Sequence, residues 1–192
     1  MATKEDIITL PNAHLRQRSQ KVGLITPEVK RVIKDMEAAT LDWEDSREHE
    51  VAVALAAIQI DVPLRIVVIR NNFDDKKDRT FTTFINPVIT KYEGTVEEDY
   101  EGCLSITSLY GKVPRYSKVR VKAINAQGKE FRMTADGFMA RLIQHEVDHN
   151  NGKVFIDHIK GIPEAFYRLT PDGKLEPLDY GKEVENNADL WN

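Results

Sequence analysis

The stretch ADGFMARLIQHEVDHNN, residues 135–151, decides the fold, because it carries both a helical apolar pattern and a metal-binding motif. Its apolar side chains recur at helical spacing and predict one buried face, with Gly152 as the C-terminal stop. These side chains are Phe138, Met139, Leu142, Ile143 and Val147. Four residues advance a helix by a little more than one turn, so His145 and His149 project from the same face.

The motif His-Glu-Val-Asp-His predicts a metal site. Two imidazoles one turn apart can bind one ion, and Glu146 between them can reach a water there as general base. The competing interpretation is an exposed helix end with solvated charges, but the apolar flank favours the edge of a core. A catalytic tetrahedral site needs three protein ligands. Several groups could supply the third, namely Cys103, His158, His14, His49 or a carboxylate.

Composition describes an ordinary globular chain of 192 residues, with 41% apolar and 30% charged residues. No apolar run is long enough to cross a bilayer, and the first residues lack the pattern of a signal peptide. The net charge of −4 argues against broad binding to nucleic acid or to a membrane surface. The single cysteine, Cys103, cannot form an intrachain disulfide, so we expect a cytoplasmic protein.

The remaining pattern places strands before the metal-motif helix. Helical spacing predicts a helix over 27–43, capped by Thr26, and the small-residue run 51–60 fits either a buried strand or a buried helix. β-branched or alternating segments predict strands at 64–70, 82–94, 118–124 and 130–134, the last two forming a hairpin. This order predicts an α+β fold with mostly antiparallel β-sheets packed around a central helix that carries the motif.

The chain divides, on this interpretation, into a catalytic domain at residues 1–165 and an acidic C-terminal extension at 166–192. We expect the extension to be solvated and held on the domain, or to trail from it. The apolar side chains available to hold it are Phe166, Tyr167, Leu175 and Leu178.

Three blocks together resemble the peptide deformylase family, over about residues 5–165. Residues 52–59 resemble the family's Gly-x-Gly-x-Ala-Ala-x-Gln block. The Glu-Gly-Cys-Leu-Ser block is matched in full at 101–105, and the Gln-His-Glu-x-Asp-His block in full at 144–149. The segment 113–115, Val-Pro-Arg, fits as well. The resemblance implies metal-dependent hydrolysis of the N-formyl group from the formyl-methionine of nascent polypeptides, which releases formate during protein biosynthesis.

The resemblance also implies a ligand set and an assignment of roles. Cys103, His145 and His149 would bind one divalent metal ion, Fe²⁺ in the cell, with Zn²⁺, Ni²⁺ or Co²⁺ able to take its place. Glu146 would take a proton from the attacking water and pass it to the leaving amine. The Gln59 side-chain amide and the Leu104 backbone N–H would stabilise the oxyanion.

Supporting and substrate-contacting roles follow from the same resemblance. Glu101 would pair with Arg115 and fix the loop that carries the cysteine. The methionine side chain needs an apolar pocket, for which we expect Val53, Ala54, Phe138 and Leu142, although ordinary core contacts explain any one of them equally well. The expected partner is a formyl-methionyl peptide or nascent chain near the ribosome, and we expect a monomer without membrane or specific nucleic-acid binding.

One block departs from the family pattern, because Ala52 and Ala54 stand where the family has glycine. If Ala54 had a positive φ angle, it would cost about 1–3 kcal/mol of backbone strain. At a negative φ its methyl group would instead narrow the substrate groove. Two other functions compete with a deformylase. A zincin-type metallopeptidase shares the histidine motif but takes its third ligand downstream, and a catalytically silent homologue would bind metal without turnover.

Overall fold

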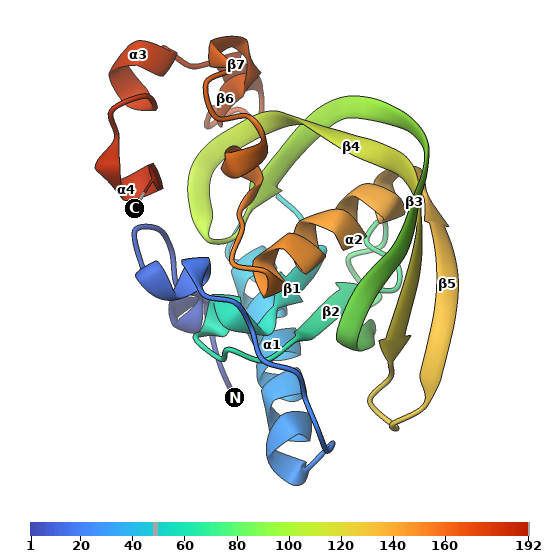
Figure 1. Cartoon of the computed structure of the whole chain (residues 1–192). Helices are drawn as coiled ribbons and strands as arrows, with labels where there is room; N and C mark the ends of the chain where they lie inside the picture. Colours follow the sequence, from blue (N-terminus) through green and yellow to red (C-terminus); the bar gives the residue numbers. More distant parts are fainter. Residues whose placement is uncertain (48–49, 192) are drawn as a thin grey trace.

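Two long antiparallel strands, β3 and β4, form a curled ribbon around which the other elements are arranged (Figure 1). The computed structural model describes residues 1–47 and 50–191. The described strands are β1 (Ala54–Ala56), β2 (Ile66–Arg70), β3 (Phe81–Cys103), β4 (Ile106–Ile124), β5 (Glu130–Asp136), β6 (Phe166–Leu169) and β7 (Leu175–Pro177). The α-helices are α1 (Pro27–Asp45), α2 (Gly137–Asn150), α3 (Tyr180–Glu183) and α4 (Ala188–Trp191). The short 3₁₀ helices are η1 (Lys4–Asp6), η2 (Ala13–Arg16), η3 (Ala57–Ile60), η4 (Phe155–His158) and η5 (Pro163–Ala165).

The strands join in one antiparallel sheet in the order β1-β2-β3-β4-β6-β7, with β5 paired to the other part of β4. Helix α2 contacts β1, β3, β4 and β5 and lies inside the curl of the ribbon (Figure 1). The predicted α+β class with mostly antiparallel strands is therefore confirmed. None of the described helices combines the length and apolarity that a bilayer crossing needs.

Strand β2 is buried on both faces because a helix covers each of them. Ile66 and Val68 belong to the apolar cluster that α1 completes. Val67 and Ile69 belong to the cluster that α2 completes. Since successive side chains of a strand point to opposite faces, a strand between two helices must be apolar at every position. This explains the uninterrupted apolar run that predicted the strand.

Helix α1 begins and ends close to its predicted bounds of 27 and 43. The Thr26 side chain accepts a hydrogen bond from the Val29 N–H, and Pro27 occupies the first turn, where a proline costs no hydrogen bond. The ambiguous run 51–60 contains both kinds of structure, because the three-residue strand β1 leads directly into η3. His49 lies outside the described residues.

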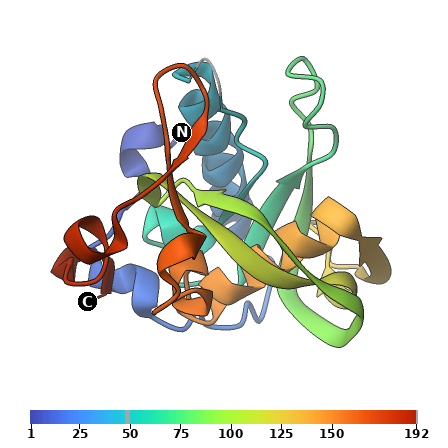
Figure 2. The same cartoon turned by 90° about the horizontal axis from the view of Figure 1, so that it is seen from above.

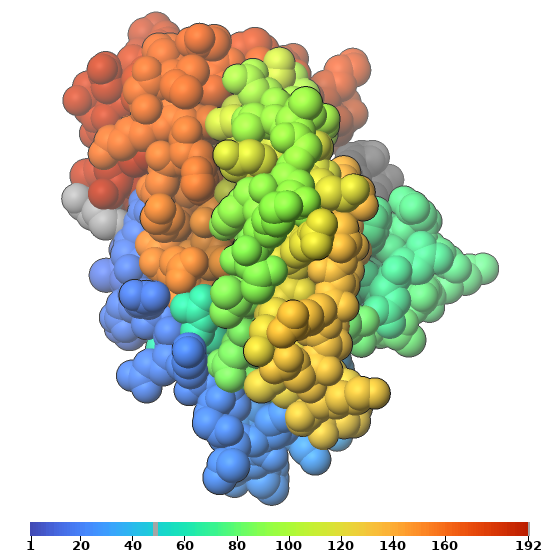
Figure 3. All heavy atoms as spheres, turned by 45° about the vertical axis from the view of Figure 1, so that its right-hand side comes forward, coloured from blue at the N-terminus to red at the C-terminus, as the bar shows by residue number. Residues whose placement is uncertain are grey.

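The β3–β4 ribbon is longer than the sequence predicted. The strand predicted at 82–94 continues to Cys103, and 106–117, for which no strand was predicted, forms the first part of β4. Residues 94–100 of β3 are all solvent-exposed, and four of them, Thr95, Glu97, Glu98 and Asp99, are polar or acidic. This segment therefore lacks the apolar alternation of a half-buried strand. Figure 3 shows β3 and β4 running side by side down this face, with the charged segment between β2 and β3 projecting beside them.

The C-terminal residues extend the same sheet instead of remaining irregular. Strand β6 pairs with β4 at Leu109–Gly111, and β7 pairs with β6. Phe166 and Val184 are each 1% exposed and contribute to the third apolar cluster. Figure 2 shows the β6–β7 hairpin, in orange and red, projecting from the body of the sheet.

A buried ion pair connects α1 to β2. The guanidinium of Arg70, which is fully buried, donates to the Glu44 carboxylate at 2.5 Å and to the Asp78 carbonyl at 2.6 Å. The same Glu44 oxygen accepts the Ala52 N–H at 3.0 Å. Because a buried charge is tolerated only with its partner, this pair fixes the segment that leads into β1.

We expect Glu44→Ala to lower the free energy of unfolding by about 3–5 kcal/mol, since it leaves the Arg70 charge buried without its counterion. Asp45→Ala is the matched control, because the adjacent Asp45–Arg79 pair is exposed, and we expect it to change stability by less than about 1 kcal/mol. Urea denaturation of both variants measures the difference. Equal effects would contradict this account of the buried pair.

Candidate active site

Three side chains that could hold a metal ion converge where α2 meets the end of the β3–β4 ribbon. The ligand atoms of Cys103, His145 and His149 all lie within 4.8 Å of one another. Cys103 ends β3, and Leu104 and Ser105 form the two-residue turn into β4. The Cys103 Sγ lies 3.3 Å from the His149 Nε2. The turn between β3 and β4 therefore places the cysteine beside two histidines of α2, although the helix lies far along the chain from it.

The carboxylate of Glu101 holds His145 in place. Its Oε2 lies 2.9 Å from the His145 Nδ1, so the other ring nitrogen, Nε2, is left for the site. Arg115 donates to both carboxylate oxygens, at 2.9 and 3.0 Å. Burial would raise the pKa of Glu101, but the hydrogen bonds of His145 and Arg115 outweigh it and hold that pKa well below its usual range. Glu101 is thus a buried anion that orients the His145 imidazole of the candidate metal-binding cluster.

Arg141 is a third partner of Glu101, and the sequence analysis did not predict it. Its guanidinium donates to the Glu101 Oε1 at 2.9 Å and to the backbone carbonyls of Val113 and Glu97 at 2.6 and 2.7 Å. The side chain is buried and joins α2 to both strands of the ribbon. The available signal was a charged residue at 141 on the face of the helix that also carries His145, one turn before it.

Asp148, the second acidic residue of the motif, pairs with two side chains outside the cluster of Cys103, His145 and His149. Its Oδ2 accepts from Arg115 at 2.5 Å and lies 2.7 Å from the His158 Nε2. His158, one of the candidate third ligands, is therefore engaged away from the cluster. His14, another candidate, is exposed and pairs with Asp61.

Glu146 lies next to His145 in the helix and lines the same cavity. It is 3% exposed, and its Oε2 has no hydrogen-bond partner among the described residues. Burial raises the pKa of Glu146 to about 7, against the charge of His145. A buried carboxylate oxygen without a protein partner fits a group that receives its hydrogen bond from a bound molecule.

Gln59 brings an amide N–H to the cysteine. Its Nε2 lies 3.5 Å from the Cys103 Sγ and donates to the Ser105 Oγ at 3.1 Å. Its Oε1 accepts the Ala56 N–H at 2.9 Å, which fixes the orientation of the amide. Leu104, the residue after the cysteine, also lines the cavity.

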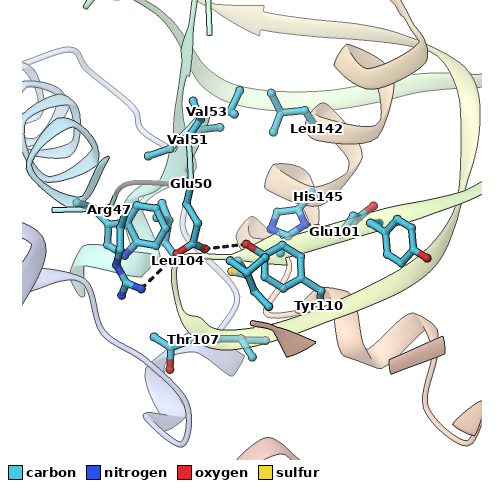
Figure 4. Close-up of a pocket in the computed structure, with 18 of the residues that line it drawn as sticks. Arg47, Glu50, Val51, Val53, Glu101, Leu104, Thr107, Tyr110, Leu142 and His145 are labelled. Atoms are coloured by element: carbon cyan, nitrogen blue, oxygen red, sulfur yellow. Dashed lines mark hydrogen bonds and ion pairs between the residues drawn. The ribbon is translucent and has the colours of Figure 1, made fainter. Parts of the chain in front are cut away.

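A cavity of about 410 Å³ opens beside these groups. All four expected substrate-contacting residues line it, namely Val53, Ala54, Phe138 and Leu142. Figure 4 shows Val53 and Leu142 on one side of His145 and Thr107 on the other. The Tyr110 hydroxyl donates to the Glu50 carboxylate at 2.7 Å within this cavity.

The two alanines of the first block are free of left-handed strain. Asp61, Asn86 and Ser108 are the non-glycine residues with positive φ in the described part of the chain. Ala54 lies in β1, paired with Ile69, and is 7% exposed. The first of the two consequences considered for Ala54 is therefore wrong, which leaves its methyl group as part of the cavity wall.

The donor set fits a catalytic divalent-metal site. One thiolate and two imidazoles are soft and borderline ligands of the kind that bind Zn²⁺ and Fe²⁺, and three protein ligands leave a fourth position for a reactant. Burial is the main cause that lowers the pKa of His149 well below its usual value, which favours the neutral imidazole that a metal ligand requires.

Comparison with known proteins identifies relatives over most of the chain. The family model described as polypeptide deformylase matches residues 4–164. A peptide deformylase of Aquifex aeolicus is 39% identical over 156 residues, which is 81% of this chain and 88% of that protein. One of Acinetobacter baumannii is 35% identical over 182 residues, covering 95% and 96%.

Solved structures give the same result for the fold. A peptide deformylase from Legionella pneumophila superposes with a TM-score of 0.72 at 36% identity, covering 84% of this chain and 88% of that one. A peptide deformylase from Synechococcus elongatus, in complex with actinonin, has a TM-score of 0.72 at 33% identity, covering 81% and 80%.

We expect the protein to bind one Co²⁺ per chain and to lose that binding when the thiol is removed. Cys103→Ala should weaken the affinity at least about 100-fold and abolish the sulfur-to-cobalt charge-transfer absorption. His14→Ala is the control, since His14 is exposed and distant from the cluster, and it should bind as the unchanged protein does. Anaerobic titration followed by absorption provides both measurements. Full binding by Cys103→Ala would exclude the cysteine as a ligand.

Proposed function

The chain belongs to the peptide deformylase family, and from this premise we propose that it removes the formyl group from the N-terminal formyl-methionine of nascent polypeptides. The family is one of metal-dependent hydrolases, and the observation that carries the proposal is the Cys103, His145 and His149 cluster beside a buried Glu146. Water cleaves the formyl C–N bond, and the products are formate and a peptide with a free amino terminus.

The proposed ligands are Cys103, His145 and His149. A divalent ion bound there would act as a Lewis acid and lower the pKa of a water molecule. We propose Fe²⁺ as the ion in the cell, with Zn²⁺, Ni²⁺ or Co²⁺ able to occupy the same ligands. The support is the mixed thiolate and imidazole donor set together with the Glu101 hydrogen bond that orients His145.

Glu146 is the proposed general base and acid. Its unpartnered Oε2 faces the cavity next to the ligand cluster. From there it accepts a proton from the attacking water and returns it to the departing amine, so one carboxylate serves both proton transfers. A glutamine at this position would keep the shape and the neighbours but could not accept the proton.

Gln59 and Leu104 are proposed to stabilise the developing negative charge on the formyl oxygen. The Gln59 amide is fixed by its own hydrogen bonds to Ala56 and Ser105, so its N–H needs little reorganisation when charge develops. The backbone N–H of Leu104 lies in the turn directly after Cys103. Two fixed donors beside the reacting carbon are the arrangement that a tetrahedral intermediate requires.

The methionine side chain is proposed to contact Val53, Ala54, Phe138 and Leu142. These residues form an apolar part of the cavity wall between β1 and α2. A formyl carbon carries only hydrogen, so a close wall also discriminates against larger acyl groups. The Ala54 methyl makes this wall closer than a glycine would.

Several broader features belong to the same proposal. We propose a cytoplasmic monomer that acts on chains near the ribosome, without membrane or specific nucleic-acid binding. We also propose that residues 1–165 are the catalytic domain and 166–192 an extension held on it. The pairing of β6 with β4 and the burial of Phe166 support the second point.

Formate release from formyl-Met-Ala-Ser, by protein prepared anaerobically with Fe²⁺ or loaded with Ni²⁺, tests the proposed function. We expect turnover that Glu146→Gln lowers by at least about 1,000-fold while the variant keeps its metal. Asp148→Asn, which changes the other acid of the motif, is the comparison and should keep more activity than Glu146→Gln. Metal-replete protein without turnover would favour a silent homologue, and cleavage of unformylated peptides would favour a zincin-type peptidase.

A further inference from the structure

The C-terminal hairpin forms part of the cavity that contains the ligand cluster. Leu169, Gly173 and Leu175 line the same cavity as Cys103 and Glu146. All three hairpin residues follow position 164, where the match to the family model ends. None of the three has a proposed role in hydrolysis or in contacting the methionine side chain.

The hairpin is held rigidly against the end of the β3–β4 ribbon. β6 pairs with β4 at Leu109–Gly111, only a few residues after the turn that carries Cys103. The rings of Tyr100 and Tyr167 meet edge to face with centroids 5.0 Å apart. The anchoring of Phe166 in the third apolar cluster adds to this attachment, so the wall is a fixed surface and not a free tail.

The surface that the hairpin offers to the cavity is apolar. Leu169 and Leu175 are directly opposite each other in the β6–β7 ladder, so their side chains share one face. Both are partly exposed, which leaves apolar area free at the cavity. The neighbouring Glu176 is exposed and, one residue along the strand, points to the other face. The chemistry that complements this face is an apolar side chain.

We propose that the β6–β7 hairpin is a specificity-determining wall, in which Leu169 and Leu175 contact an apolar side chain of a residue downstream of the formyl-methionine. This inference rests on the proposed function. Val53 and Leu142 lie on one side of His145 and Thr107 on the other (Figure 4). With the methionine on the Val53 and Leu142 side, Thr107 and the hairpin, which line the same cavity, remain available to the residues that follow it.

The test compares formyl-Met-Ala-Ser with formyl-Met-Leu-Ser and formyl-Met-Ala-Leu. The unchanged protein should prefer at least one leucine peptide. Leu175→Ser should lower kcat/KM for that peptide about five-fold, through KM, and change formyl-Met-Ala-Ser less than about two-fold. Glu176→Ala, on the opposite face of the same strand, should leave all three values unchanged. Equal losses for the three peptides, or no leucine preference in the unchanged protein, would overturn the proposal.

Introducing a charge at the same position gives a test whose positive result a loss of stability cannot mimic. Leu175→Glu should transfer the preference to a peptide with lysine in place of the favoured leucine, a gain that misfolding cannot produce. The free peptides Met-Leu-Ser and Met-Ala-Leu, titrated calorimetrically into metal-loaded protein, give the same comparison without catalysis. If no formate is released but Leu175→Ser still weakens peptide binding, only the proposed function is refuted. Normal formate release, with peptide affinities that Leu175→Ser does not change, would refute only the proposed role of the hairpin.

Discussion

The buried carboxylate of Glu101 is the interaction on which the rest of the site depends. It accepts hydrogen bonds from Arg115 on β4 and from Arg141 and His145 on α2, so a single anion joins the end of β3 to both other elements. Removing a carboxylate from water is costly unless every oxygen is paired, and here both oxygens are. The network also contains Asp148, so one buried and one partly buried carboxylate balance two buried guanidinium groups. The local charge is thus compensated before any metal ligand is considered.

This network explains why the fold and the site are inseparable. The cysteine and the two histidines come from segments more than 40 residues apart, and only the curl of the ribbon around α2 brings them together. Arg141 fixes the curl through backbone carbonyls of both strands. On the other side of β1, the Arg70–Glu44 pair holds the segment that leads to Gln59. Buried polar contacts of this kind select one packing of the strands and helices over similar packings. Their net contribution to the free energy of folding is smaller.

Much of the fold and of the site could be predicted from the sequence. Each failure falls where the sequence carries no regular apolar pattern. Periodicity identified α1 and α2 because each buries one regular apolar face, and an uninterrupted apolar run identified β2 because that strand is buried on both faces. The outer part of β3 escaped prediction because solvent covers both of its faces, and the start of β4 because Gly111 and Pro114 interrupt its pattern. The C-terminal strands escaped because β6 has only four residues and β7 only three, too few for a periodic pattern to be recognised. Arg141 escaped because a charged side chain gives no periodic signal when its partners are backbone carbonyls from distant strands.

The most direct test of the central claim is anomalous diffraction from crystals of the protein grown with Ni²⁺, measured on both sides of the nickel absorption edge. We expect one strong anomalous peak per chain, within bonding distance of the Cys103 Sγ and of the Nε2 atoms of His145 and His149. The Glu101 carboxylate should remain hydrogen-bonded to the Nδ1 of His145. A peak held by another residue, such as His158, or by the two histidines without the cysteine, would contradict this expectation.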